Sequence, residues 1–145
     1  MSDNTRPTLA AGLRHREQMV VAPEHTVPRV GPDWAGFRDM PPVFATAMMI
    51  GFIEQTCIEA LRPYLSAEQR TVGTHVDVSH VATTPIGMTV IASIELIEVE
   101  GRILLFRVAC HDDAGLIGEG LHRRAIIDLE RFMHKLASKG GNGAG

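Results

Sequence analysis

One apolar helix, expected over residues 43–65, constrains the fold of this chain more than any other segment. The stretch VFATAMMIGFIEQTCIEALRPYL is apolar or small on most sides, and its polar stripe consists of Gln55, Glu59 and Arg62. Pro63 ends the helix, because a proline ring cannot continue a helix interior. A helix that is hydrophobic nearly all round has to be covered by other elements. The rest of the chain must therefore wrap around it.

The residues after the helix change to the alternation that is typical of strands. In TVGTHVDVSHV we expect Val72, Val76 and Val78 to face one way, and His75 and Asp77 the other. Two further strands, GMTVIASIELIEVE and RILLFRVACHD, are joined at VEGR, which is a hairpin signal. A last strand, GLIGEGLHRRAIIDL, runs into a short helix, ERFMHKLA. One long helix followed by hairpin-linked strands predicts an α+β fold, a curved antiparallel sheet around the helix.

The core of this sheet and the domain limits also follow from the pattern. The apolar face of the strand over RILLFRVACHD is expected to consist of Leu104, Phe106, Val108 and Cys110. A chain of 145 residues forms one domain, predicted over 18–138, between a flexible segment 1–17 and a flexible glycine-rich tail 139–145. Within it, one strand is expected over 18–27. A proline-punctuated loop, 28–42, follows and leads directly into the helix.

Composition excludes several classes of function. The net charge of −3 gives no general reason to bind nucleic acid or an anionic membrane. No apolar run approaches the roughly 20 residues that span a bilayer, and the N-terminus lacks the apolar segment of a signal peptide. Cys57 and Cys110 lie inside apolar patterns and are expected as core residues of a reducing compartment, the cytoplasm. The seven histidines lack zinc-motif spacing, so no metal or cofactor is expected.

Glu54 is the unusual residue of the helix. Its neighbours three and four positions away are Ile50, Gly51, Cys57 and Ile58, which are all apolar or small. An unpaired charge on a buried face is costly. Glu54 is therefore either a carboxylate at the edge of this face that reaches solvent, or a site residue with a partner.

His80 and Thr46 are the candidates to accompany it. If the alternation continues, His80 lies on the same face of the strand as Val76 and Val78, toward the helix. There it is either a core histidine or a partner whose imidazole Glu54 orients. In the second case we expect Glu54 and His80 within hydrogen-bonding or one-water reach. Thr46 lies about 12 Å from Glu54 along the helix axis. It either caps the helix, or its hydroxyl acts as a nucleophile or positions a water molecule.

Four stretches together carry a family resemblance: PPVFAT with GFIEQTCIEALRPYL, TVGTHVDVSHVATTPIGMTV, VEGRILLFRV and IGEGLHRRAIIDLERF. Over residues 18–137 the chain resembles the fluoroacetyl-CoA thioesterase family of hotdog-fold acyl-CoA thioesterases. The resemblance implies a hotdog fold, a homodimer with the active site at the subunit interface, and an acyl-CoA substrate. It also implies that Thr46, Glu54 and His80 are catalytic and that Gly73 and Arg124 lie near the acyl group.

One departure from the family concerns the proline loop. Met40 occupies the position at which the fluoroacetyl-specific member has a phenylalanine lid residue, so a broader range of acyl groups is expected. Trp34 and Phe37 of the same loop are either lid aromatics or loop anchors, and His122 lines either the pocket or a solvated strand face. The predicted activity is hydrolysis of a small acyl-CoA thioester to the free acid and CoA. The alternatives are an acyl-CoA dehydratase on the same fold and a non-catalytic acyl-CoA sensor.

Overall fold

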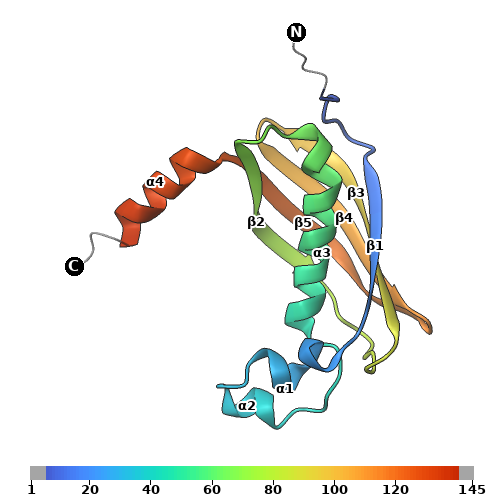
Figure 1. The fold of residues 1–145 in the computed structure, drawn as a ribbon. Helices are drawn as coiled ribbons and strands as arrows, with labels where there is room; N and C mark the ends of the chain where they lie inside the picture. Colours follow the sequence, from blue (N-terminus) through green and yellow to red (C-terminus); the bar gives the residue numbers. More distant parts are fainter. Residues whose placement is uncertain (1–5, 141–145) are drawn as a thin grey trace.

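The computed structural model describes residues 6–140, in which one curved antiparallel sheet lies around one long helix (Figure 1). The helix, α3, spans Thr46–Leu61 and runs along the concave face of the sheet. The strand order is β1-β3-β4-β5-β2, so β1 and β2 are the two edge strands. The strands span Arg14–Val20 (β1), Gln69–Val78 (β2), Thr89–Glu100 (β3), Ile103–Asp112 (β4) and Gly115–Asp128 (β5). This is the architecture predicted from the sequence.

The core lies between α3 and the central strands. The expected core face of β4 is confirmed, since Leu104, Phe106, Val108 and Cys110 are all buried. Equivalent alternate positions of β3 are buried against them, and the helix contributes mainly Met49, Ile53, Cys57 and Leu61. Both cysteines are free and buried, and burial raises the pKa of each thiol to about 12. The sequence prediction of two core thiols therefore agrees with the structure.

The N-terminal third differs in detail from the prediction. The first strand ends at Val20 rather than continuing to residue 27, because Pro23 has no N–H for a strand ladder and begins a short 3₁₀ turn, Pro23–His25. The expected loop contains two single-turn helices, α1 (Val27–Val30) and α2 (Ala35–Arg38). Trp34 packs edge-on against Phe37, with ring centroids 5.0 Å apart, and a Cβ at Gly31 would collide with the Trp34 ring. These two aromatic residues therefore pack the loop against itself.

The predicted domain limits also shift. Strand β1 begins at Arg14, inside the segment 1–17 that was expected to be flexible. The terminal helix α4, Leu129–Gly140, extends two residues into the expected tail. Gly12 and Leu13, just before β1, exchange backbone hydrogen bonds with Leu96. Residues 1–5 and 141–145 of the two predicted terminal segments lie outside the described residues.

Strand β2 carries a β-bulge between Gly73 and His75. Before the bulge, Gly73 pairs with Arg124, and after it Val76 pairs with His122, so both Gly73 and Val76 are on the helix side. Val72 pairs with Ala125 and is on the other face. The prediction that Val72, Val76 and Val78 share one face was therefore wrong at Val72, because the extra residue of a bulge reverses the alternation.

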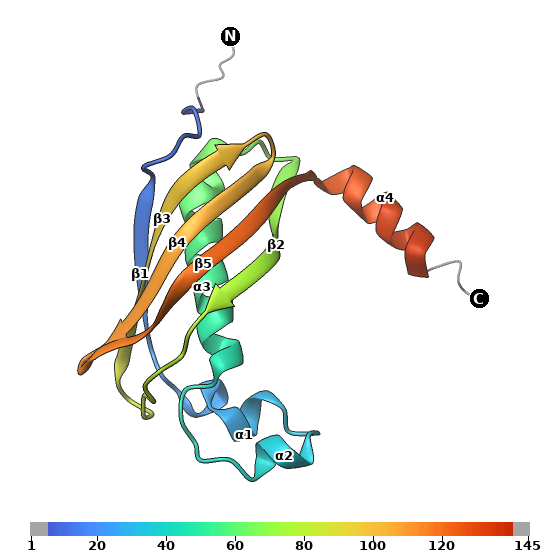
Figure 2. The ribbon, with the colours of Figure 1, turned by 180° about the vertical axis from the view of Figure 1, so that it is seen from behind.

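Helix α4 projects away from the sheet on the side of β2 (Figures 1 and 2). Its side chains from Glu130 onward are exposed, including the apolar Phe132, Met133 and Leu136. Among the described residues no helix is long and apolar enough to cross a membrane.

Candidate active site

Thr46 and His80 meet at the start of α3. Thr46 is the first residue of the helix, and Ala45 occupies the capping position, so the Thr46 hydroxyl is available for another contact. Its Oγ1 lies 2.7 Å from Nδ1 of His80, which follows the end of β2. The two side chains border a depression of about 630 Å³, lined by Val27, Val43, Phe44, Thr46, His80, Val81, Ala82 and Thr83. A hydroxyl in direct contact with an imidazole is the arrangement of an activated nucleophile.

The environment of His80 favours its neutral form. Burial lowers the pKa of His80, and the backbone of Ala82 opposes this shift with a smaller effect. The Nε2 atom is buried and has no hydrogen-bond partner among the described residues. In the tautomer with its proton on Nε2, Nδ1 accepts the hydrogen bond that the Thr46 hydroxyl donates. This is the state in which an imidazole can remove the proton of a hydroxyl group or of a water molecule.

Glu54 lies in a second cluster, further along α3. Its Oε2 accepts a hydrogen bond of 3.0 Å from Nη1 of Arg124, which is the ion-pair partner that the sequence left open. The Arg124 side chain is only 3% exposed, whereas that of Glu54 is 37% exposed. A Cβ on Gly73 would collide with Oε2 of Glu54, so a glycine is needed here for the carboxylate to reach the arginine.

Thr71 holds the other side of the same guanidinium, a role that sequence reasoning missed. Arg124 donates from Nε to the Thr71 hydroxyl at 2.9 Å and from Nη2 to the Thr71 carbonyl at 2.8 Å. The missing signal was the bulge, since only with it does Thr71, two residues before Gly73, face the helix.

His122 belongs to this cluster rather than to a solvated strand face. Its side chain is 1% exposed, and its Nδ1 lies 2.8 Å from the carbonyl oxygen of His75. Its Nε2 lies 3.1 Å from Nη1 of Arg124 and 4.0 Å from Oε2 of Glu54. Burial is the main cause that lowers the pKa of His122. Arg124 adds to this effect, and the His75 carbonyl and Glu54 oppose it.

The predicted site residues thus form two groups within one chain. Thr46 contacts His80, whereas Glu54, Gly73 and Arg124 contact one another. In the described residues no hydrogen bond or ion pair joins Glu54 to His80, although the sequence predicted that they would be in reach of each other. Two turns of helix, about 12 Å, separate Thr46 from Glu54.

Met40 is 51% exposed and is not among the residues that line the depression at Thr46. Its backbone N–H donates to the carbonyl of Phe37, which ties it to the end of α2. Across residues 6–140 no three histidine, cysteine or acidic side chains are grouped as metal ligands.

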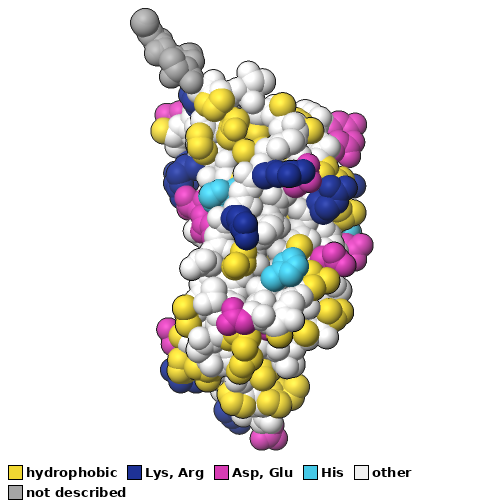
Figure 3. Space-filling view, turned by 90° about the vertical axis from the view of Figure 1, so that its right-hand side faces the viewer, with side chains coloured by type: hydrophobic (Ala, Val, Ile, Leu, Met, Phe, Trp, Pro, Cys, Tyr) yellow, Lys and Arg dark blue, Asp and Glu magenta, His cyan; other side chains and the backbone are white. Residues whose placement is uncertain are grey.

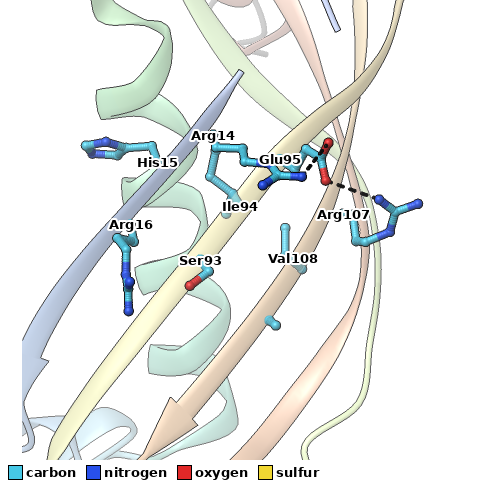
Figure 4. A pocket seen from close by; sticks show the side chains of 9 residues that line it. Arg14, His15, Arg16, Ser93, Ile94, Glu95, Arg107 and Val108 are labelled. Carbon is cyan, nitrogen blue, oxygen red and sulfur yellow. Dashed lines mark hydrogen bonds and ion pairs between the residues drawn. The ribbon is translucent and has the colours of Figure 1, made fainter. Parts of the chain in front are cut away.

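A separate depression of about 620 Å³ lies beside β1, β3 and β4, away from both clusters (Figure 4). Glu95 lies between two arginines there, 3.6 Å from Arg14 and 3.3 Å from Arg107. Both arginines are largely exposed, so these pairs contribute little to stability.

Comparison with known proteins connects this geometry to one family. The family model described as "Fluoroacetyl-CoA-specific thioesterase" matches residues 21–130. A fluoroacetyl-CoA thioesterase from Streptantibioticus cattleyicolor is 42% identical over 131 residues, which is 90% of this chain and 94% of that protein. A solved structure of fluoroacetyl-CoA thioesterase superimposes with a TM-score of 0.90 at 41% identity, over 92% of this chain and 98% of the other. A thioesterase superfamily member from Thermus thermophilus matches with a TM-score of 0.79 at 26% identity, over 93% and 97% of the two chains.

The fold and these matches define the protein as a hotdog-fold thioesterase, a hydrolase of acyl-CoA thioesters. Within that class, the chain belongs to the fluoroacetyl-CoA-specific thioesterase family.

Proposed function

We propose that this protein hydrolyses small acyl-CoA thioesters with Thr46, His80 and Glu54 as catalytic groups, and that the acyl group binds beside Gly73 and Arg124. The observation that carries the proposal is the 2.7 Å contact between the Thr46 hydroxyl and His80 at the start of α3. No metal or cofactor is required, because a thiolate is a good leaving group and the barrier lies mainly in forming the oxyanion.

In the proposed mechanism Nδ1 of His80 accepts the proton of the attacking group. This group is either the Thr46 hydroxyl or a water molecule held by it, and it attacks the thioester carbonyl carbon. The backbone N–H groups of Thr46 and Ala47, the first two residues of α3, have no partner within the helix, whereas Met48 donates to the carbonyl of Ala45. The N–H groups of Thr46 and Ala47 can therefore stabilise the developing oxyanion. The C–S bond then breaks and CoA leaves as the thiolate. If Thr46 is the nucleophile, water hydrolyses the acyl-enzyme in a second step.

The proposal includes a homodimer. The side of α3 that carries Glu54 is not covered by the sheet of its own chain, since Ala47, Gly51 and Ile58 are exposed. A second copy would complete this wall, and it would give Glu54 and His80 of different copies the chance to meet.

Of the two edge strands, β2 is the better candidate for the contact between the two copies of the homodimer. The other edge, β1, begins with Arg14, His15, Arg16 and Glu17, and charged side chains discourage edge-to-edge pairing. Figure 3 shows basic and acidic side chains interleaved on the side of the molecule that carries β1. The exposed centre of β2 runs from Gly73 to Asp77 and carries fewer such side chains, His75 and Asp77, beside Gly73, Thr74 and Val76.

The position of α4 also supports this arrangement. It projects beyond β2 (Figure 1). Its apolar residues Phe132, Met133 and Leu136 are exposed. A helix of 12 residues is marginal in water without packing partners. In an antiparallel pairing of two β2 strands, the start of one strand lies opposite the end of the other. Because α4 leaves the sheet beside the start of β2, it would extend over the second copy.

The acyl group is the part of the function that the relatives leave open for this chain. The curated relative is named for fluoroacetyl-CoA, and a variant of the solved thioesterase was crystallised with acetyl-CoA. We propose that this protein accepts small acyl groups more broadly, because Met40 is flexible and replaces a rigid ring. The cytoplasm remains the predicted location.

A thiol-release assay with a panel of CoA thioesters tests this function. The panel contains acetyl, fluoroacetyl, four-carbon, branched and aromatic acyl groups, and Thr46→Val and His80→Asn are the control variants. We expect release of free CoA from the small thioesters, with a loss of at least 100-fold in kcat/KM in both variants. Hydration or dehydration without thiol release would indicate a dehydratase, and binding without turnover would indicate a sensor. Either result would refute the proposal.

A further inference from the structure

We propose that His122 is a positioning residue: as a neutral imidazole, it accepts a hydrogen bond from Arg124 and so fixes the guanidinium that holds Glu54. The proposal rests on the function proposed above, because it assigns His122 a role in that reaction. It also goes beyond the sequence, which left His122 undecided between pocket and surface.

The tautomer of His122 follows from its neighbours. The carbonyl oxygen of His75 can only accept, so Nδ1 at 2.8 Å must donate and carries the proton. In a neutral ring Nε2 is then a lone-pair acceptor. Nη1 of Arg124, 3.1 Å away, can only donate. The two contacts are therefore compatible with one state of the ring, protonated at Nδ1 and unprotonated at Nε2.

The hydrogen bonds of Arg124 show what this acceptor does. One N–H of Nη1 is directed to Glu54 and the other to His122, while Nε and Nη2 bind the hydroxyl and the carbonyl of Thr71. With Thr71 as the only other partner, the Nε and Nη2 side of the guanidinium would be held, but its Nη1 end could move. His122 holds the Nη1 end, which is the end that contacts the Glu54 carboxylate. Since 1 Å of displacement at a reacting group can cost about two orders of magnitude in rate, fixing this end is a contribution to catalysis.

Protonation of His122 would reverse the arrangement. Within residues 6–140, the charged or titratable groups that act on its ring are Arg124 on its own strand, Glu54 on α3, and exposed His75 on β2. An Nε2–H would oppose the Nη1 donor of Arg124 and compete with it for Glu54, 4.0 Å away. Because the buried ring is neutral, Glu54 keeps its hydrogen bond to Arg124.

Two matched variants separate positioning from simple packing. In His122→Gln, the side-chain oxygen can occupy the place of Nε2 and accept from Arg124. In His122→Asn, the shorter amide can still donate to the His75 carbonyl but cannot reach Arg124. Both changes leave a polar, uncharged side chain on β5, and thermal unfolding of each variant measures the structural cost separately.

We expect kcat/KM to stay within about threefold of the unmodified protein in His122→Gln and to fall about 10- to 100-fold in His122→Asn. If His122 acts through Arg124, the two positions must also be coupled. In an Arg124→Lys background, His122→Asn should change kcat/KM by less than about threefold. Single-turnover measurement with enzyme in excess extends the range to slow variants. Where turnover is lost, the affinity of each variant for the free carboxylate product, measured by calorimetry, gives the same double-mutant comparison of His122→Asn and Arg124→Lys.

Additive effects of His122→Asn and Arg124→Lys would overturn the proposal, as would equal loss in the Gln and Asn variants or no loss in either. In those cases thiol release by the unmodified protein still supports the thioesterase function. Absence of thiol release by the unmodified protein would instead refute the function itself, whatever the variants do.

Discussion

Gly73→Ala gives the most direct test of the cluster around Glu54. A Cβ at this position would collide with Oε2 of Glu54 and would also lie 3.2 Å from His122 Cε1 and 3.4 Å from Arg124 Nη1. The backbone of Gly73 has no positive φ, so alanine adds no conformational strain and the destabilising effect is steric. The lower entropy of the unfolded chain acts in the opposite direction, and Gly36→Ala shares it. Restoring an ordinary contact requires the carboxylate to move by about 1 Å, which is enough to break its 3.0 Å hydrogen bond to Arg124.

The expected magnitude follows from the burial of the two partners. A hydrogen bond between charged groups contributes about 1.5–3 kcal/mol. The Glu54 side chain is more than one third exposed, and water can replace part of the lost interaction. Arg124 also keeps Thr71 and His122 as acceptors. We therefore expect the free energy of unfolding to fall by about 1–2 kcal/mol, which corresponds to a decrease in Tm of about 3–8 °C for a domain of this size.

Thermal and urea unfolding at one fixed protein concentration measure this change. Gly36→Ala is the matched control, because a Cβ at Gly36, in α2, would meet no atom within 4 Å. It should leave the free energy of unfolding unchanged or raise it slightly. Glu54→Asp shortens the carboxylate by one methylene and should restore part of the stability lost in Gly73→Ala. An unchanged Tm in Gly73→Ala, or no recovery in the double variant, would refute the steric argument.

Three further predictions concern the lid, the imidazoles and the terminal helix. Met40→Phe should lower the ratio of kcat/KM for a four-carbon to a two-carbon thioester by about 10- to 200-fold at most; an unchanged ratio would remove Met40 from the lid. Burial lowers the pKa of His80 and of His122, so the unfolded chain binds protons that the folded chain does not once the pH falls below about 6.5. Stability should thus decrease with falling pH in this range, and kcat/KM should fall at lower pH as His80 or His122 becomes protonated in the folded protein. His122→Gln should reduce the pH dependence of stability, which urea titrations at several pH values can test. Leu136→Glu, on the uncovered face of α4, should shift the protein toward the 15.8 kDa monomer in light scattering, and a stable monomer before any substitution would contradict the homodimer.

The sequence predicted the helix, the later strands and the core face of β4, because long periodic segments encode their own buried side. It did not predict the start of β1 or the helices α1 and α2, which are too short to show a period. Tertiary contacts determine such segments instead. The aromatic contact between Trp34 and Phe37 is one example, since it depends on a turn that alternation cannot show.

The candidate site shows the same division. The position of Glu54 on an apolar side of α3 left it either at the solvent edge or with a partner, and the family resemblance implied that Arg124 lies near the acyl group. It could not pair the two, because the bulge at Gly73 and His75 decides which residues of β2 face the helix. In the sequence, a bulge changes the alternation of apolar and polar residues at one position only, which is too little to locate it. Assigning Thr71 and His122 to the cluster required the register between β2 and β5.

The burial of the two cysteines has a practical consequence for every measurement of turnover. With a thiol pKa of about 12, neither Cys57 nor Cys110 forms appreciable thiolate at neutral pH, and the thiolate is the form that attacks an aromatic disulfide reagent. In the folded protein such a reagent should therefore record only the CoA that is released. The same two thiols become reactive when the core opens, so their labelling rate in the absence of substrate reports how often Cys57 and Cys110 are exposed by unfolding.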